Sequence, residues 1–239
     1  MERIVSGKEH QIQYVLEQKP VKNLNLRIRK DGSVYVSAGP SVPLQLVDEF
    51  VEQKAAYICR VRDQFLSMAE YAPKPKQYIS GESFSVLGRG LRLKVEQADT
   101  EEVYSDGVYI FLRVKDTGNF KRKEQLMTRY LNQQCRDTFS EVIADIYPTF
   151  RKYGVAFPSL KIKNMDTRWG SCIAGKGIIT LNKRLLEVPL HCIEYVVMHE
   201  FCHFIHPDHS KKFYALLTML MPDWKERKTV LEKHAMYGL

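Results

Sequence analysis

The sequence predicts an α+β fold, in which a β-rich N-terminal part packs on a mainly helical C-terminal domain that contains a small sheet. Short alternating runs of apolar and polar residues dominate up to about residue 118, whereas helical periodicity dominates after it. Hydrophobic residues make up 44% and charged residues 27%, as in ordinary globular proteins. For a chain of 239 residues we therefore expect two parts, residues 1–118 and 119–239.

Within the first part, residues 24–38 predict a β-hairpin. The runs LNLRIRK and SVYVSA alternate on either side of Asp31-Gly32, a pair that favours tight hairpin turns. Apolar residues from Leu46 towards Leu66 then recur at helical spacing, which predicts one amphipathic helix. The runs GESFSVLGRGLRLKVEQ and VYSDGVYIFLRV alternate again and are expected to complete a small sheet.

The second part begins with a long helical pattern. Apolar residues from Lys121 to about Tyr147 recur every three to four positions, and Pro148 is expected to end this helix. Two strand-like runs, SLKIKNM and GIITLN, flank Arg168–Ser171, and a further helix begins after Pro189.

Hydropathy and cysteine spacing indicate the cellular location to expect. No run approaches the roughly 18 apolar residues of a membrane span, and the polar start MERIVSGKEHQIQ lacks the apolar stretch of a signal peptide. The five cysteines lack CxxC spacing, so they suggest neither a disulfide framework nor a cysteine zinc finger. We therefore expect a cytoplasmic protein with reduced thiols and no membrane partner.

The net charge of +8 favours anionic partners. The basic residues are spread along the chain without an RNP-type motif or a long basic run, which is also typical of a solvated basic surface. Weak nucleic-acid contact through this surface is the most that the charge predicts.

The segment YVVMHEFCHF contains the pattern HExxH within an apolar helix. Helical positions four apart return to within about 40° of the same face, roughly 6 Å along the axis, so His199 and His203 can chelate one ion. A charged Glu200 in so apolar a helix would be costly unless a metal ion or a cavity satisfied it. These residues predict a metal site.

The third ligand has to come from outside this helix. Pro207 disfavours helical geometry at the residue before it and cannot donate to a continuing helix, so the chain should turn after about Ile205. Such a turn can carry His209 back to the metal. The alternatives are His206 and a later acid, of which the nearest glutamates are Glu226 and Glu232.

This set of residues suits one zinc ion and hydrolytic chemistry. Zinc held by neutral imidazoles keeps an open position for water and lowers the pKa of that water towards about 7. Glu200, beside the ligands but not needed as one, can accept the proton and pass it to the leaving group.

Several blocks along the chain resemble one family in their order. They are TRWGSC at 167–172, GIITLNKRLLEVP at 177–189, EYVVMHEFCHFIHPDHSKKFY at 194–214 and MPDW at 221–224. They resemble the YgjP-like metal-dependent hydrolases, zincin metallopeptidases related to the SprT and WLM groups, and the β-rich front is similar as well. The resemblance implies a zincin-like C-terminal domain and a zinc-dependent hydrolase, with His199, His203 and His209 as ligands and Glu200 as catalytic acid/base.

The residues beside the metal motif allow two readings each. Arg168 could bind a substrate carboxylate or phosphate, while the neighbouring strand pairs with an extended peptide. Trp169 and Gly170 are interpreted as structural, with the ring filling the core and the glycine supplying a special backbone angle. Tyr195 lies one helical turn before His199 and either donates to an oxyanion or packs.

Three functions compete at this level. The first is a zinc metallopeptidase that acts on a peptide or protein substrate. The second is a metal-dependent hydrolase of phosphoanhydrides or nucleotides, for which an anionic phosphorylated substrate would suit the basic surface. The third is a nucleic-acid-associated protein with a structural zinc, although such sites usually have four protein ligands.

Overall fold

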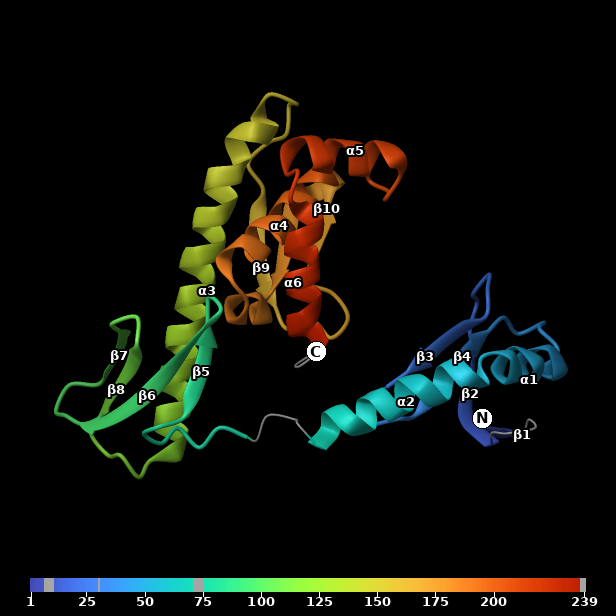
Figure 1. The fold of residues 1–239 in the computed structure, drawn as a ribbon, viewed down its shortest axis with the longest axis horizontal. Helices are drawn as coiled ribbons and strands as arrows, with labels where there is room; N and C mark the ends of the chain where they lie inside the picture. Colours follow the sequence, from blue (N-terminus) through green and yellow to red (C-terminus); the bar gives the residue numbers. More distant parts are fainter. Residues whose placement is uncertain (7–10, 30, 71–74, 237–239) are drawn as a thin grey trace. The chain divides into compact units, whose positions relative to one another are not determined.

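The computed structural model describes residues 1–239 except 7–10, 30, 71–74 and 237–239. The fold is α+β, as predicted, with N-terminal strands and C-terminal helices (Figure 1). The chain divides into two compact units, residues 1–73 and 74–239. The predicted boundary at residue 118 falls inside the second unit, because the strands before it and the helix after it contribute to one hydrophobic core.

The first unit is a four-stranded sheet with two helices. Its strand order is β1-β2-β4-β3, and the central pair β2 and β4 is parallel. The predicted hairpin is confirmed as β3 and β4, in which Leu26 lies opposite Val36, and Gly32 takes the left-handed turn position at φ 79°. The elements are β1 Glu2–Ser6, β2 Gln11–Gln18, β3 Asn25–Ile28, β4 Val34–Ala38, α1 Leu44–Gln53 and α2 Ala55–Glu70.

The single helix predicted after this hairpin is wrong, because the chain forms α1 and α2. Lys54 leaves helical geometry between them, although neither proline nor glycine marks the position. The break keeps Val51 and Ile58 in the same buried cluster against the sheet. The side chain of Leu66, the last predicted apolar position, lies outside the described part.

The second unit begins with another four-stranded sheet, so the one small sheet expected before residue 118 is in fact two sheets. The order β5-β6-β8-β7 has a parallel central pair, β6 and β8, and repeats the arrangement of the first unit. Leu87 and Gly88 form the first tight turn, both at positive φ. The strands are β5 Ser83–Val86, β6 Arg89–Gln97, β7 Glu102–Ser105 and β8 Tyr109–Val114.

Helix α3, Phe120–Arg151, packs on β7 and β8. Its first turn is capped by Asn119, whose side-chain oxygen accepts from the Arg122 N–H at 3.0 Å. The expected end at Pro148 is wrong, since the proline lies inside the helix. Proline removes one backbone donor, but the last turn continues because Phe150 is fully buried.

A three-stranded sheet follows, in the order β10-β11-β9, with β9 and β11 parallel and β10 antiparallel at one edge. The two predicted strands are β9, Ser159–Lys163, and β11, Ile178–Asn182. Strand β10, Gly170–Ile173, was not predicted because GSCI has no clear alternation. Two short 3-10 turns, η1 Ala174–Lys176 and η2 Lys183–Glu187, connect this region.

The chain ends in three helices: α4 Leu190–Cys202, α5 Lys211–Leu220 and α6 Trp224–Met236. Helix α4 begins after Pro189, as predicted, and contacts α3, α5, α6 and β10. In the described part of the chain, no helix is both long and apolar enough to cross a membrane.

Candidate active site

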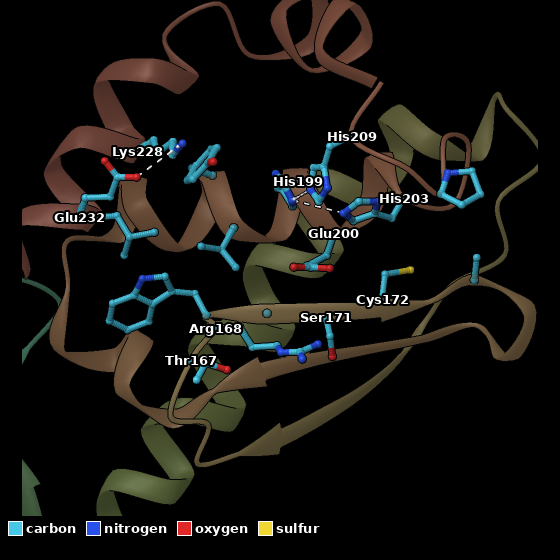
Figure 2. A pocket seen from close by; sticks show the side chains of 17 residues that line it. Thr167, Arg168, Ser171, Cys172, His199, Glu200, His203, His209, Lys228 and Glu232 are labelled. Atoms are coloured by element: carbon cyan, nitrogen blue, oxygen red, sulfur yellow. Dashed lines mark hydrogen bonds and ion pairs between the residues drawn. The ribbon is translucent and has the colours of Figure 1, made fainter. Parts of the chain in front are cut away.

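Three histidines converge at the C-terminal end of α4 (Figure 2). Their Nε2 atoms face one another: that of His199 lies 3.2 Å from that of His203 and 3.0 Å from that of His209. Helical spacing brings His199 of α4 and His203, the residue that caps the end of α4, to the same side, and the segment before α5 brings His209. Together they form a group whose ligand atoms all lie within 4.8 Å of one another.

The turn after α4 explains which histidine joins the group. The helix ends at Cys202, earlier than the turn expected after Ile205, and the His206 N–H donates to the Cys202 carbonyl. The carbonyl of His206 lies 3.2 Å from His203 Nδ1, which must therefore donate to it. His206 thus holds the His203 ring through its backbone, while its own ring is outside the three-histidine group.

The donor set fits a metal such as zinc. Burial, reinforced by the charges of His203 and His209, lowers the pKa of His199 to about 3. Burial also lowers the pKa of His203. Both rings are therefore neutral at pH 7, as metal ligation requires. Nitrogen separations of 3.0–3.2 Å are close to the roughly 3.3 Å edge of a tetrahedron with Zn–N bonds of about 2.0 Å.

Glu200 lies next to this group and faces β10 (Figure 2). Its side chain is only 5% exposed. Burial raises the pKa of Glu200 to about 8, and the positive charge of Arg168 acts in the opposite direction. A buried carboxylate with a pKa near neutrality is the kind of group that exchanges protons efficiently.

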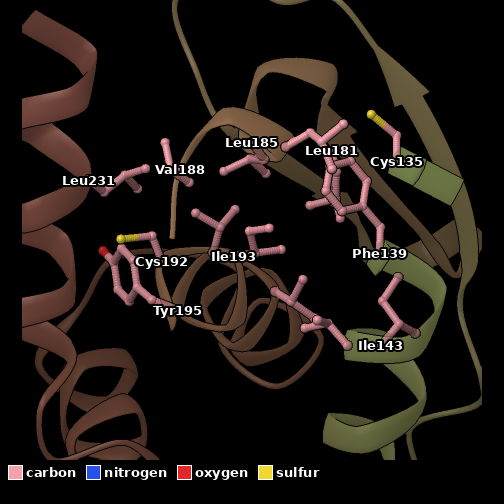
Figure 3. Packing of buried hydrophobic residues seen from close by; sticks show 14 of the residues in the cluster. Cys135, Phe139, Ile143, Leu181, Leu185, Val188, Cys192, Ile193, Tyr195 and Leu231 are labelled. Atoms are coloured by element: carbon pink, nitrogen blue, oxygen red, sulfur yellow. The ribbon is translucent and has the colours of Figure 1, made fainter. Parts of the chain in front are cut away.

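The other sides of α4 are packed in the core, which fixes the direction of its polar face. Cys192 and Ile193 of α4 lie between α3 and α6 in a cluster of buried side chains (Figure 3). Arg227 of α6 adds an ion pair to Glu194 of α4 and donates to the carbonyl of His191. Of the site residues, His199 and Glu200 therefore extend from a helix that is held in place by packing on its other sides.

A cavity of about 640 Å³ opens over these residues. The segment before β10 with β10 itself forms one wall, and α6 contributes Lys228, Leu231 and Glu232. Glu232, considered from the sequence as a metal ligand, pairs with Lys228 at 3.5 Å instead, and Glu226 is absent from the lining. Nothing in the pattern of α6 distinguished its cleft-facing residues from a solvated helix face.

Both candidate substrate-binding residues line this cavity. Arg168 is exposed, and its guanidinium lies beneath Glu200 (Figure 2). Tyr195 is buried between its neighbours, with its ring edge-on to His199 and stacked on Trp224. Burial raises the pKa of Tyr195 to about 12, so the phenol keeps its proton.

The structural interpretation of Trp169 and Gly170 holds in part. Trp169 is half-buried and packs against the main core. Gly170, however, is not among the residues with positive φ, so a special backbone angle is the wrong reason for a glycine. The reason is space, because a Cβ built there would lie 2.6 Å from Glu200 Oε1.

Asn182 is a residue that sequence reasoning missed. It is fully buried at the end of β11, and its Nδ2 donates to the carbonyls of Met165 and Arg168 at 2.7 and 3.0 Å. Its backbone N–H donates to the carbonyl of Trp169 at 2.8 Å. Asn182 thereby holds the segment that leads into β10, and its only sequence signal was a polar residue closing an apolar strand.

Comparison with known proteins gives a consistent result. A search of the curated proteins finds no match to the chain. The family described as YgjP-like, metallopeptidase domain, matches residues 22–234, a range that contains the three histidines, Glu200 and every residue lining the cavity. Since this match covers most of the sequence, the chain belongs to the YgjP-like metallopeptidase domain family.

Proposed function

We propose that this protein is a zinc-dependent metallopeptidase in which His199, His203 and His209 hold one zinc ion and Glu200 is the catalytic acid/base. One observation carries the proposal: three imidazole Nε2 atoms converge beside a buried carboxylate at the floor of an open cavity. Three ligands leave a coordination position free, which is typical of catalytic rather than structural zinc.

The chemistry of the chain's own residues follows from this arrangement. Zinc, when bound, polarises a carbonyl and lowers the pKa of water. Glu200 accepts the proton of the attacking water and delivers it to the leaving amine nitrogen. Its burial excludes bulk solvent from this transfer, and the packing of α4 keeps the carboxylate beside the histidines.

Strand β10 is suited to hold the substrate. It lies at the edge of its sheet, next to the cavity, so its outer backbone groups can pair with an extended peptide. In this proposal Arg168 binds a carboxylate of the substrate and Tyr195, which keeps its proton, donates to the developing oxyanion.

A phosphoanhydride or nucleotide hydrolase is the second candidate. Arg168 and Lys228, from opposite walls, both line the cavity and would attract a phosphorylated substrate. The peptidase is preferred because the edge strand gives a peptide backbone its own partners, whereas a nucleotide would leave them unused.

The five cysteines are all free, which supports our proposal of a reducing, cytoplasmic location. Locating the protein in fractionated cells tests this part separately.

The decisive experiment compares Glu200→Gln with wild type on an unbiased peptide library, after metal content has been measured by mass spectrometry. We expect one zinc per chain in both proteins and cleavage by wild type alone. Glu232→Gln is the matched control, because this carboxylate lines the same cavity but lies outside the histidine group, and it should retain activity. A zinc-loaded wild type that cleaves no peptide, but releases phosphate from nucleotides in a Glu200-dependent way, would replace the first candidate with the second.

A further inference from the structure

We propose that Gly170 is a positioning residue for Glu200: the absence of a side chain at the start of β10 creates the space that the catalytic carboxylate occupies. This inference rests on the proposed role of Glu200 and adds a residue outside the HExxH motif to the same site. It assigns a specific task to a glycine that sequence reasoning explained by backbone conformation.

The contact involves the whole end of the Glu200 side chain. A Cβ at Gly170 would lie 2.6 Å from Oε1, 2.9 Å from Cγ and 3.0 Å from Cδ of Glu200. Real Cβ atoms essentially never approach heavy atoms within 3.0 Å, so the two groups cannot coexist in this arrangement. Since the φ of Gly170 is not positive, the requirement for glycine is purely one of volume.

The backbone of β10 is not free to withdraw from such a clash. Gly170 pairs with Leu181 in the antiparallel ladder, and Leu181 is fully buried. The residue before it, Trp169, accepts a hydrogen bond from the backbone of Asn182, whose side chain also holds the Arg168 carbonyl. These bonds fix the strand at the point where it passes Glu200.

The backbone of Glu200 is equally constrained. It lies within α4, and its neighbours Val197 and Phe201 are fully buried in the main core. The ring of Phe201 also stacks on Phe150 of α3, with centroids 4.9 Å apart. What can move is the Glu200 side chain, so a methyl group at position 170 displaces the carboxylate from its place beside the histidines.

Gly170→Ala is therefore expected to separate catalysis from binding. A displacement of about 1 Å in a catalytic group lowers turnover by roughly 100-fold. We expect kcat for a cleaved peptide to fall by about this factor, while KM and the affinity for Zn²⁺ or Co²⁺ stay within twofold of wild type, since the three atoms nearest to a Cβ at position 170 all belong to Glu200 and none to a histidine.

Gly175→Ala is the matched control. Gly175 lies in η1, just after β10, has no atom within 4 Å of a built Cβ and does not take a positive φ. This variant should keep wild-type kcat. Equal kcat values for the two variants, or a loss of metal affinity in Gly170→Ala that matches its loss of activity, would overturn the inference.

A second measurement does not depend on peptidase activity. The melting temperature is compared for wild type, Gly170→Ala, Glu200→Ala and the double variant, all without metal. We expect Gly170→Ala to lower the melting temperature by about 3 °C when Glu200 is present. In the Glu200→Ala background, Gly170→Ala should lower the melting temperature by clearly less, because the clashing atoms are gone.

The two measurements fail for different reasons. Additive melting-temperature shifts would reject the contact between position 170 and Glu200, whatever the enzyme cleaves. A non-additive cycle in a protein that cleaves no peptide would keep the steric role of Gly170 and reject the peptidase.

Discussion

The two four-stranded sheets have the same strand order, but only the second shares a hydrophobic core with the helix that carries the candidate active site. In each, two hairpins are joined so that the central strands, β2 and β4 or β6 and β8, run parallel, and helix follows the last strand. The first sheet forms a separate buried cluster with α1 and α2. The second shares one cluster with α3 and with α4, the helix that carries the HExxH motif.

The turns of the two sheets reflect this difference. The turn at Gly32 closes its own hairpin, with the Gly32 N–H donating to the Arg29 carbonyl. The turn at Leu87 and Gly88 instead donates to the carbonyls of Leu186 and Glu187 in η2, at 2.7 and 3.3 Å. A common strand arrangement thus forms a self-contained unit in one place and part of the core around the HExxH helix in the other.

Metal binding should distinguish the two units most strongly. At a free zinc concentration of about 1,000 times Kd, binding adds about 4 kcal/mol to the free energy of unfolding of the unit that holds the site. We expect calorimetry to resolve two transitions and a chelator to lower only that of residues 74–239. A chelator that lowers both transitions equally would contradict separate units.

Two matched core substitutions come next in size. Ile12 of β2 and Ile110 of β8 are 1% and 0% exposed. Changing either one to alanine should therefore lower the free energy of unfolding of its unit by about 3 kcal/mol. Ile12→Ala is expected to lower only the chelator-insensitive transition, and Ile110→Ala only the chelator-sensitive one. Guanidinium titrations with and without zinc provide the measurement, and a loss of zinc affinity in Ile12→Ala would break the comparison.

The docking of the second sheet onto the segment before α4 can be measured at Gly88. Its φ is 77°, and a Cβ there would lie 2.8–3.1 Å from Pro189. Gly88→Ala should lower the free energy of unfolding by about 2 kcal/mol, because it adds both backbone strain and this close contact. The control Gly107→Ala has a φ of 89° and no atom within 4 Å, so it should cost only about 1 kcal/mol. Equal losses in urea unfolding would reject a specific role for the contact.

The smallest effect concerns acid stability of the first unit. Arg3 donates to both oxygens of Asp48, Tyr14 donates to one, and the hydrogen bond from Arg3 is the main reason that the pKa of Asp48 is lowered. The ionised carboxylate therefore stabilises the first unit fully at pH values above 3.8, the ordinary pKa of an aspartate. This contribution is lost as the pH falls through the lowered pKa of Asp48. Asp48→Asn should make the unfolding transition of the first unit, residues 1–73, less dependent on pH in acid, and it should leave the transition of residues 74–239 unchanged.

Local patterns predicted much of this fold. The hairpin at Asp31-Gly32, the α+β class and the helix after Pro189 follow from turn chemistry and from side-chain periodicity, which act within a few residues. Predictions were wrong where packing prevailed over local preference. The helix breaks at Lys54 although no proline or glycine lies there, and α3 continues through Pro148.

The sequence alone contains the HExxH pattern and the blocks that indicate the family. Pro207, which disfavours a continuing helix, also predicted His209 as the third metal ligand. Only the tertiary structure decided what surrounds these residues, because β10, Asn182 and the cleft wall on α6 meet the motif through contacts between segments far apart in the chain. Gly170 illustrates the limit. A sequence can suggest that a glycine is needed for its backbone freedom, but only the packed structure reveals that the space is filled by Glu200.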